Sequence, residues 1–272
     1  MDIANIKLNN GITIPQIGLG TWLNKDKKEC FSTVKYALDI GYRHIDTAQA
    51  YSNEEFIGEA IKRSGVQRKD IFITTKIWTE NLSEDRLQNS FDESLKRLET
   101  DYIDLLLIHF PVTEYRKKAW IIMEEIYKAK KAKSIGVSNY TITHLKELLS
   151  ECSIKPVLNQ VELHVFLQQP DLIEYCKQNN IVIEAYSPLA HGEGLDNTTL
   201  IKIGEKHNKS TAQIMIRWCI EKGLIPLPKS NNNNRIKQNF EVFDFSLDKE
   251  DMNMIENLDK NLRTCWDPTD TP

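Results

Sequence analysis

The 272-residue sequence has no long hydrophobic run and few cysteines. No apolar stretch approaches the roughly 20 residues that a membrane-spanning helix needs. The first residues, Met-Asp-Ile-Ala-Asn-Ile-Lys, have neither the basic nor the apolar part of a secretory signal. The five cysteines are scattered without a Cys-x-x-Cys pair, which predicts reduced thiols and no disulfide, thiol nucleophile or zinc site. We therefore expect a cytoplasmic protein.

An excess of positive charge is also missing. The chain has 35 Lys and Arg against 39 Asp and Glu, a net charge of −4, so we expect neither nucleic acid nor a membrane as partner. The one basic cluster, around Lys128–Lys133, closes an amphipathic helical stretch, where cations complement the helix dipole at a solvated face. No Gly-x-Gly-x-x-Gly follows a strand, which argues against Rossmann-type dinucleotide binding.

Short apolar runs alternate with longer amphipathic stretches along the chain. The runs that predict buried strands are Ile17–Thr21, Tyr42–Thr47, Ile71–Ile77, Ile103–His109, Ser134–Ser138, Val157–Val161, Ile181–Tyr186 and Leu224–Leu227. The helical patterns cover about 26–40, 53–64, 83–98, 117–131, 141–150, 170–179, 198–222 and 232–240. Strands that are each followed by a helix indicate a parallel sheet covered by helices.

Such an alternation allows an open sheet or a closed barrel, and the count of eight strands favours a (β/α)8 TIM barrel of the α/β class. Upstream, Asn9-Asn10-Gly11 between two short apolar segments predicts a β-hairpin, which we expect to cap the bottom of the barrel. An extra C-terminal helix is predicted at about 248–259. No linker interrupts the chain, so we expect one domain over residues 1–272.

Polar residues stand where six of the eight apolar runs stop. These endings are Asp46, Lys76, His109, Ser138-Asn139, Asn159-Gln160 and Tyr186-Ser187. The carboxyl ends of barrel strands form one mouth, which is where active sites of this architecture are built. One polar ending would be an ordinary loop start, whereas six predict a functional site.

Three of these strand endings, together with Tyr51, suit the protonation of an oxyanion. Lys76 at a strand end needs an acidic partner, and Asp46 on the adjacent strand is placed to supply it. Tyr51, five residues later, can fold back over the mouth, where the nearby ammonium is expected to lower its pKa and let it act as a general acid. His109 can hydrogen-bond the same substrate oxygen. We interpret His44 as structural and expect no metal, because lysine, amides and tyrosine are poor ligands.

Several motifs then match one known family. The segment Gly41–Ala48 (GYRHIDTA) with Tyr51 and Asn53-Glu54, the segment Ile135–Asn139 (IGVSN), and Pro228–Ser230 (PKS) leading into Arg235 resemble the aldo-keto reductase signature. The resemblance extends from the N-terminal hairpin to about residue 262. Compact microbial members, similar to 2,5-diketo-gluconate reductases and prostaglandin F synthase-like enzymes, are the best match, because the loops after Phe110 and over 190–197 are short.

The resemblance implies NADPH-dependent carbonyl reduction with Tyr51 as general acid, tuned by Lys76 and Asp46, and with His109 orienting the carbonyl. It implies that NADPH is bound by Thr21, Trp22, Ser138, Asn139, Gln160, Tyr186, Ser187, Leu189, Lys229, Ser230, Arg235, Gln238 and Asn239. Within this set, Ser138, Asn139 and Gln160 hold the nicotinamide carboxamide and Tyr186 stacks on the ring. Lys229 and Arg235 also bracket a helix start after the eighth strand, where barrels commonly bind phosphate, which favours NADPH over NADH.

Aromatic residues that follow strand ends are expected to line the substrate pocket beside His109. These are Trp22, Trp78 and Phe110, and Trp266 of the tail can join them. Small aldehydes, 2-oxo-aldehydes such as methylglyoxal, keto sugars and prostaglandin-type substrates all fit. The alternatives are a non-catalytic NADPH-sensing subunit, which loss of a catalytic residue would favour, and a barrel isomerase or hydrolase, which needs carboxylate or metal chemistry. We expect a monomer, because no helix shows an unusually broad apolar face.

Overall fold

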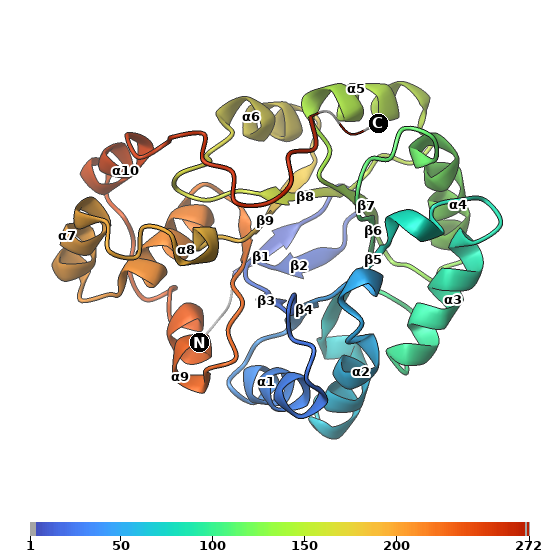
Figure 1. Cartoon of the computed structure of the whole chain (residues 1–272), viewed down its shortest axis with the longest axis horizontal. Coiled ribbons are helices and arrows are strands. Elements are labelled where there is room, and N and C mark those ends of the chain that lie inside the picture. The colour runs from blue at the N-terminus through green and yellow to red at the C-terminus, as the bar shows by residue number, and fades with distance from the viewer. Residues whose placement is uncertain (1–3, 270, 272) are drawn as a thin grey trace.

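The strands of the chain form a parallel barrel, as the computed structural model shows for residues 4–269 and 271. The eight-stranded sheet keeps the order of the sequence, and all its neighbouring strands pair in parallel. Its strands are β3 (Leu19–Gly20), β4 (His44–Asp46), β5 (Phe72–Ile77), β6 (Leu105–Ile108), β7 (Ile135–Ser138), β8 (Leu158–Glu162), β9 (Val182–Tyr186) and β10 (Ile225–Leu227). Figure 1 looks into the ring. The predicted (β/α)8 barrel is confirmed.

Two glycines close the ring between β3 and β10. The amide of Gly18 donates to the Pro226 carbonyl and the amide of Gly20 to the Pro228 carbonyl, each at 3.1 Å. A Cβ on Gly20 would lie 2.9 Å from the Leu227 carbonyl oxygen, so the first and last strands approach this closely because Gly20 has no side chain.

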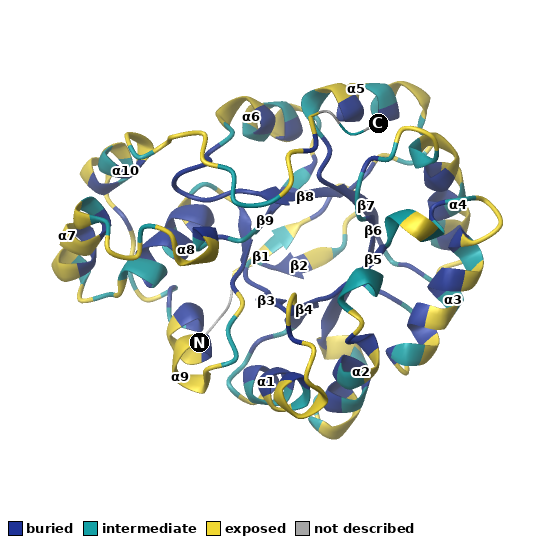
Figure 2. Cartoon of the chain, viewed as in Figure 1, coloured by how far each residue is buried: buried dark blue, intermediate teal, exposed yellow. Residues whose placement is uncertain are grey.

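Helices surround the ring, and each buries one face against the ring or against a neighbouring helix. They are α1 (Lys27–Asp39), α2 (Glu54–Arg63), α3 (Leu87–Arg97), α4 (Arg116–Lys128), α5 (Ile142–Glu151), α6 (Pro170–Gln178), α7 (Thr198–His207), α8 (Thr211–Glu221), α9 (Asn233–Phe240) and α10 (Lys249–Glu256). Figure 2 shows their inward faces buried and their outward faces exposed. None of the helices in the described residues is long and apolar enough to cross a membrane.

The predicted single helix over 198–222 is wrong. The chain forms α7 and α8 there, because Asn208 adopts a left-handed conformation with φ of 52° that ends the first helix. Ser210 then starts the second helix through a capping box with Gln213. The sequence carries signals for this break, because no apolar residue lies between Ile203 and Ala212, and Asn208 and Ser210 are residue types that often end and begin helices. The helix expected from residue 83 also begins later, at Leu87, after a turn closed by the Ser83 carbonyl.

The predicted hairpin is present and fills the bottom of the barrel. Strands β1 (Asn5–Lys7) and β2 (Thr13–Pro15) pair antiparallel, with Ile6 opposite Ile14. Leu8 and Ile14 pack in one buried cluster with residues of the barrel strands, among them Leu105 and Leu107. At the other end of the chain, the predicted extra helix is α10, and the segment after it crosses over the opposite mouth of the barrel (Figure 1).

Candidate active site

A cleft of about 1060 Å³ lies at the carboxyl ends of the strands. It contains the residues that the sequence predicted for cofactor and substrate, together with three of the four predicted catalytic residues. The predicted residues that line it are Thr21, Trp22, Asp46, Tyr51, Trp78, His109, Phe110, Ser138, Asn139, Gln160, Tyr186, Ser187, Leu189, Lys229, Ser230, Arg235, Gln238 and Asn239. Lys76 lies beneath this surface and is fully buried. The structure thus brings the predicted residues together in one site.

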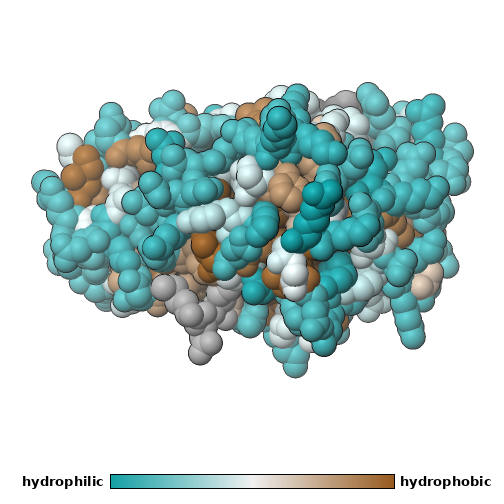
Figure 3. Space-filling view, turned by 90° about the horizontal axis from the view of Figure 1, so that it is seen from below, coloured by the Kyte–Doolittle hydropathy of each residue, from teal (hydrophilic) through white to brown (hydrophobic). Residues whose placement is uncertain are grey.

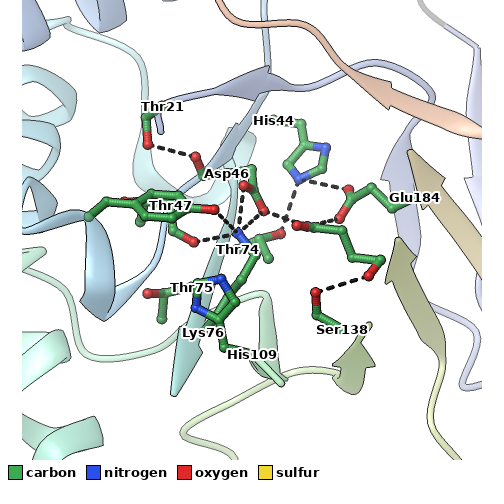
Figure 4. A network of polar contacts seen from close by, with 12 residues as sticks. Thr21, His44, Asp46, Thr47, Thr74, Thr75, Lys76, His109, Ser138 and Glu184 are labelled. Atoms are coloured by element: carbon green, nitrogen blue, oxygen red, sulfur yellow. Dashed lines mark hydrogen bonds and ion pairs between the residues drawn. The ribbon is translucent and has the colours of Figure 1, made fainter. Parts of the chain in front are cut away.

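Asp46 and Lys76 form a buried ion pair at the floor of the cleft. The Lys76 Nζ donates to both carboxylate oxygens of Asp46, at 2.7 and 2.9 Å, and to the Thr47 carbonyl at 2.9 Å (Figure 4). Burial by itself would lower the pKa of Lys76, but the attraction of Asp46 and the other nearby anionic groups outweighs it and raises the pKa. Lys76 is therefore a fixed positive charge at neutral pH.

Tyr51 reaches this pair from a short 3-10 helix, Gln49–Tyr51, that follows β4. Its hydroxyl lies 3.4 Å from the Lys76 Nζ. The turn is held by Asn53, whose side chain accepts from the Thr47 hydroxyl at 2.7 Å and donates to the Thr21 carbonyl at 2.9 Å. The signature residue Asn53 therefore has a structural role, because it ties the Tyr51 turn to the loops after β3 and β4.

The prediction that Lys76 lowers the pKa of Tyr51 below its usual value is wrong for the protein by itself. Burial raises the pKa of Tyr51, and the opposing attraction of Lys76 is smaller because the Asp46 carboxylate already balances the ammonium charge. The phenol therefore stays protonated at neutral pH. A hydroxyl that is protonated and lies within reach of a buried ammonium can still release its proton when an oxyanion forms beside it.

His109 directly follows β6 and faces Tyr51 across the cleft, with their ring centroids 5.7 Å apart. Burial lowers its pKa well below the usual 6.5, and the charge of Lys76 adds to this effect. His109 is therefore a neutral imidazole at neutral pH. Its buried Nδ1 makes no hydrogen bond within the part of the chain that the structure describes. A neutral imidazole can donate a hydrogen bond to a substrate oxygen and carries no charge while it does so.

The ends of β7, β8 and β9 present amides and a phenol side by side. The Asn139 Nδ2 donates to the His109 carbonyl at 3.0 Å, and its Oδ1 accepts from the Tyr186 hydroxyl at 2.8 Å. The Gln160 Nε2 donates to the Asp46 Oδ2 at 2.8 Å. Asn159, in contrast, is absent from the cleft lining and bonds the backbone of Tyr140, because neighbouring strand residues point to opposite faces.

Two cations lie at the far end of the cleft, after β10. Lys229 and Arg235 are exposed, and neither has an ion-pair partner among residues 4–269 and 271. Helix α9 begins between them, with the Asn232 side chain accepting from the Arg235 amide at 3.1 Å. A helix N-terminus flanked by two cations suits an anionic group of a ligand.

Aromatic rings form the outer wall near His109. Trp78 meets His109 edge to face at 5.1 Å, and Phe110 meets Trp266 at 6.1 Å. Trp22 is 44% exposed and contacts His191 edge to face at 5.5 Å. An apolar wall of this kind accommodates carbon chains or rings next to the polar floor.

Sequence reasoning missed lining residues from three segments of the chain. Ser210, Thr211 and Ala212 at the start of α8 line the cleft. The capping box of Ser210 with Gln213 was the available signal for this helix start. His191 and Cys265 also line the cleft, 3.3 Å apart between Nε2 and Sγ. No local pattern indicates this contact, since the two residues come from distant segments.

Comparison with known proteins identifies the family. The model of the "Aldo/keto reductase family" matches residues 16–260. A glyoxal reductase of Bacillus subtilis is 46% identical, over 97% of this chain and 95% of its own length. A 9,11-endoperoxide prostaglandin H2 reductase of Trypanosoma cruzi is 45% identical, over 97% of this chain and 94% of its own. The solved aldo-keto reductase of Bombyx mori in complex with NADP is 37% identical with a TM-score of 0.92, over 98% and 96% of the two chains.

The site thus belongs to an oxidoreductase. The chain is a member of the aldo/keto reductase family, as its sequence motifs predicted.

Proposed function

We propose that this protein reduces aldehydes and ketones to alcohols with NADPH, with Tyr51 as the general acid. The observation that carries the proposal is the Tyr51 hydroxyl at the cleft floor, 3.4 Å from the Nζ of a Lys76 already paired with Asp46. The cofactor is NADP(H), which a solved relative holds. When bound, NADPH supplies a hydride to the substrate carbon.

The donor chemistry of the cleft fits this cofactor at both ends. Ser138, Asn139 and Gln160 offer hydroxyl and amide groups beside Tyr51, where a carboxamide needs donors and acceptors. Lys229 and Arg235, which lack ion-pair partners among the described residues, suit the 2′-phosphate at the other end. The cleft volume of about 1060 Å³ is at the upper end of ordinary ligand sites, as an extended dinucleotide and a small substrate require.

Proton transfer to the substrate oxygen is the step that the protein's own residues perform. Tyr51 gives its phenolic proton to the oxygen as the C–O double bond becomes a single bond, so hydride and proton together yield the alcohol. Lys76, held by Asp46, stabilises the phenolate left behind. His109 donates a hydrogen bond that orients the same oxygen, and the phenolate regains its proton from water.

The substrates that suit the cleft best are small aldehydes and 2-oxo-aldehydes. The aromatic side chains of Trp78 and Phe110 stand beside a polar floor formed by Tyr51 and His109. In addition, the similar Bacillus subtilis protein is a glyoxal reductase. Methylglyoxal and an activated aromatic aldehyde are therefore the first substrates to assay.

Tyr51→Phe removes the phenolic proton and leaves the ring in place. We expect kcat/KM for the aldehydes to fall about 10²–10⁴-fold, the range for loss of a general acid. The Kd for NADPH, measured by fluorescence titration, should stay within about twofold of wild type because a variant lacking only the hydroxyl keeps the cleft. Turnover is followed by the loss of NADPH absorbance.

Each outcome separates the proposal from its alternatives. A variant that keeps wild-type turnover would remove Tyr51 from the chemistry. A wild-type protein that binds NADPH but reduces no aldehyde or ketone of a broad panel would be an NADPH-sensing subunit instead of a reductase.

A further inference from the structure

Glu184 is a buried carboxyl group directly beneath the cleft that the proposed reaction does not use. It lies on β9 two residues before Tyr186 and is fully buried. Its Oε2 accepts a hydrogen bond of 2.6 Å from the Gln160 Nε2. Its Oε1 lies 3.5 Å from the His44 Nε2 (Figure 4). Glu184 is therefore connected to the active site through the side chain of Gln160.

The charges around Glu184 indicate that it is a neutral acid. The single ammonium nearby, Lys76, is already paired with Asp46. His44 supplies no charge, because burial, aided by the charge of Lys76, lowers its pKa to about 3. On the neighbouring strand β10 the residue opposite Glu184 is the apolar Ile225. Burial, followed by the charge of Asp46, raises the pKa of Glu184 to about 8.

Gln160 uses both of its N–H groups toward carboxyl groups. One bond reaches Asp46 at 2.8 Å and the other reaches Glu184 at 2.6 Å. Asp46 is an anion held by Lys76, so the donor nitrogen of the amide must face it. The Gln160 Oε1 then points away from both carboxyls, and no hydrogen bond from a described residue reaches it. Gln160 lines the cleft, so this oxygen is the group available to a ligand donor.

We propose that Glu184 is a positioning residue for the cofactor, which holds the Gln160 amide so that its oxygen accepts from the nicotinamide carboxamide. The inference rests on the proposed function, because the ligand of Gln160 is NADPH. Without an acceptor at position 184, one N–H of Gln160 is left unpaired in a buried site. The amide then loses its single orientation, and the cofactor loses a preformed contact.

The test compares Glu184→Gln with Glu184→Leu. Glutamine imitates the neutral acid, since its oxygen can accept from Gln160 and its N–H₂ can face His44. We expect the Kd for NADPH of Glu184→Gln to stay within about twofold of wild type and that of Glu184→Leu to rise about tenfold, the effect of one lost buried hydrogen bond. Glu124→Leu, which removes a buried carboxyl on α4 away from the cleft, is the matched control.

A double-mutant cycle distinguishes positioning from a general structural effect. In a Gln160→Leu background, the additional effect of Glu184→Leu on the Kd should shrink to less than about twofold, because Glu184 acts through the Gln160 amide. Equal effects in both backgrounds overturn the proposal, as does a Glu184→Gln variant that binds NADPH as weakly as Glu184→Leu. Wild-type protein that does not bind NADPH overturns the proposed function itself.

A second measurement serves if Glu184→Leu does not fold. Between pH 7 and pH 9.5 the wild-type carboxyl loses its proton, and the new negative charge favours the positive ring of NADP⁺ over NADPH. We expect the affinity ratio of NADP⁺ to NADPH to rise several-fold in wild type and to stay flat in Glu184→Gln. A ratio that rises as much in Glu184→Gln as in wild type overturns the role of Glu184.

Discussion

Side chains at the mouth of the barrel divide into those with partners inside the protein and those that face the cleft without one. Lys76 has three protein oxygens at 2.7–2.9 Å and is a permanent part of the site. Lys229 and Arg235 have no ion-pair partner in the described residues, so their charges are available to a ligand. In the proposed function, catalysis and cofactor selection therefore depend on different side chains and can be tested separately.

Arg235 should discriminate NADPH from NADH. Replacing it with alanine removes a charge-assisted hydrogen bond to the 2′-phosphate, a contact of about 1.5–3 kcal/mol that corresponds to about 10–100-fold in binding. We expect the KM for NADPH to rise by this factor in Arg235→Ala, while the KM for NADH changes less than about twofold. Lys237→Ala, on the outer part of the same helix α9, is the control. A parallel loss for both cofactors would contradict a role in phosphate recognition.

The buried histidines should make the fold sensitive to acid. The pKa of His44 is lowered to about 3 and that of His109 well below 6.5, whereas both titrate near 6.5 in the unfolded chain. Below pH 6.5 the unfolded state therefore binds protons that the folded state does not. The free energy of unfolding then decreases as the pH is lowered. Each histidine contributes about 1.4 kcal/mol per pH unit.

Urea unfolding between pH 5 and pH 7 measures this dependence. As the pH is lowered, the unfolding free energy of His109→Gln should decrease less steeply than that of wild type. The difference in slope should be about 1.4 kcal/mol per pH unit, the contribution of one histidine. The pH profile of kcat/KM for wild type should show no inflection near pH 6.5, because His109 remains neutral there. An inflection at pH 6.5 that His109→Gln abolishes would mean that the imidazole titrates normally.

At the scale of elements, one carboxylate accepts three hydrogen bonds from the C-terminal segment over the mouth. Glu162 at the end of β8 accepts from the Thr264 amide at 2.6 Å, from the Thr264 hydroxyl at 2.5 Å and from the Cys265 amide at 3.2 Å. The segment continues to Trp266, which contacts Phe110. The buried end of a barrel strand thus helps to place an aromatic residue of the cleft wall.

Glu162→Ala should loosen this segment. We expect the backbone amides of Thr264 and Cys265 to exchange hydrogen at least about tenfold faster, since hydrogen bonds to a charged acceptor are worth about 1.5–3 kcal/mol. Mass spectrometry of a peptide over 258–269 measures the exchange. Thr264→Ser keeps the donors and should retain protection close to wild type. Unchanged exchange in Glu162→Ala would show that other contacts hold the segment.

At the scale of the whole molecule, the two ends of the barrel differ in the side chains they contain. The cleft and its polar residues lie at the carboxyl ends of the strands, while the hairpin and an apolar cluster close the amino ends. This division is typical of the barrel architecture. Substitutions at the bottom should therefore change stability without changing the reaction.

Ile14→Ala tests this separation. Ile14 is fully buried in the hairpin cluster, so its truncation should reduce the free energy of unfolding by about 2–5 kcal/mol. The kcat/KM for the aldehyde at a temperature where the variant is folded should remain within about twofold of wild type. Thr13→Ala, at an exposed position of the same strand, is the control. A large loss of kcat/KM would show that the bottom of the barrel influences the mouth.

The monomeric state and the single domain remain predictions. Figure 3 shows a mostly hydrophilic side of the molecule, over α1, α2 and α9 in Figure 1, which suits a solvated surface. Large exposed apolar residues such as Trp22, Leu23, Leu195 and Trp266 line the cleft. Light scattering after size-exclusion chromatography determines the mass of the particle directly.

The sequence by itself determined the barrel and most of the residues that line its cleft. Strand runs, amphipathic helices and the polar strand endings are local patterns, and the parallel barrel brings such endings to one mouth. Asp46, Tyr51, Lys76 and His109 were therefore predictable as neighbours.

Tertiary structure alone decided the features that depend on surroundings. The contact of His191 with Cys265 and the hydrogen bonds from Thr264 to Glu162 each join distant segments that no local pattern marks. The pKa of Tyr51 was expected to fall and instead rises, because desolvation depends on the whole enclosure and not on one neighbouring charge. Glu184 is buried beneath the cleft for the same reason, because only the closed barrel encloses its side chain.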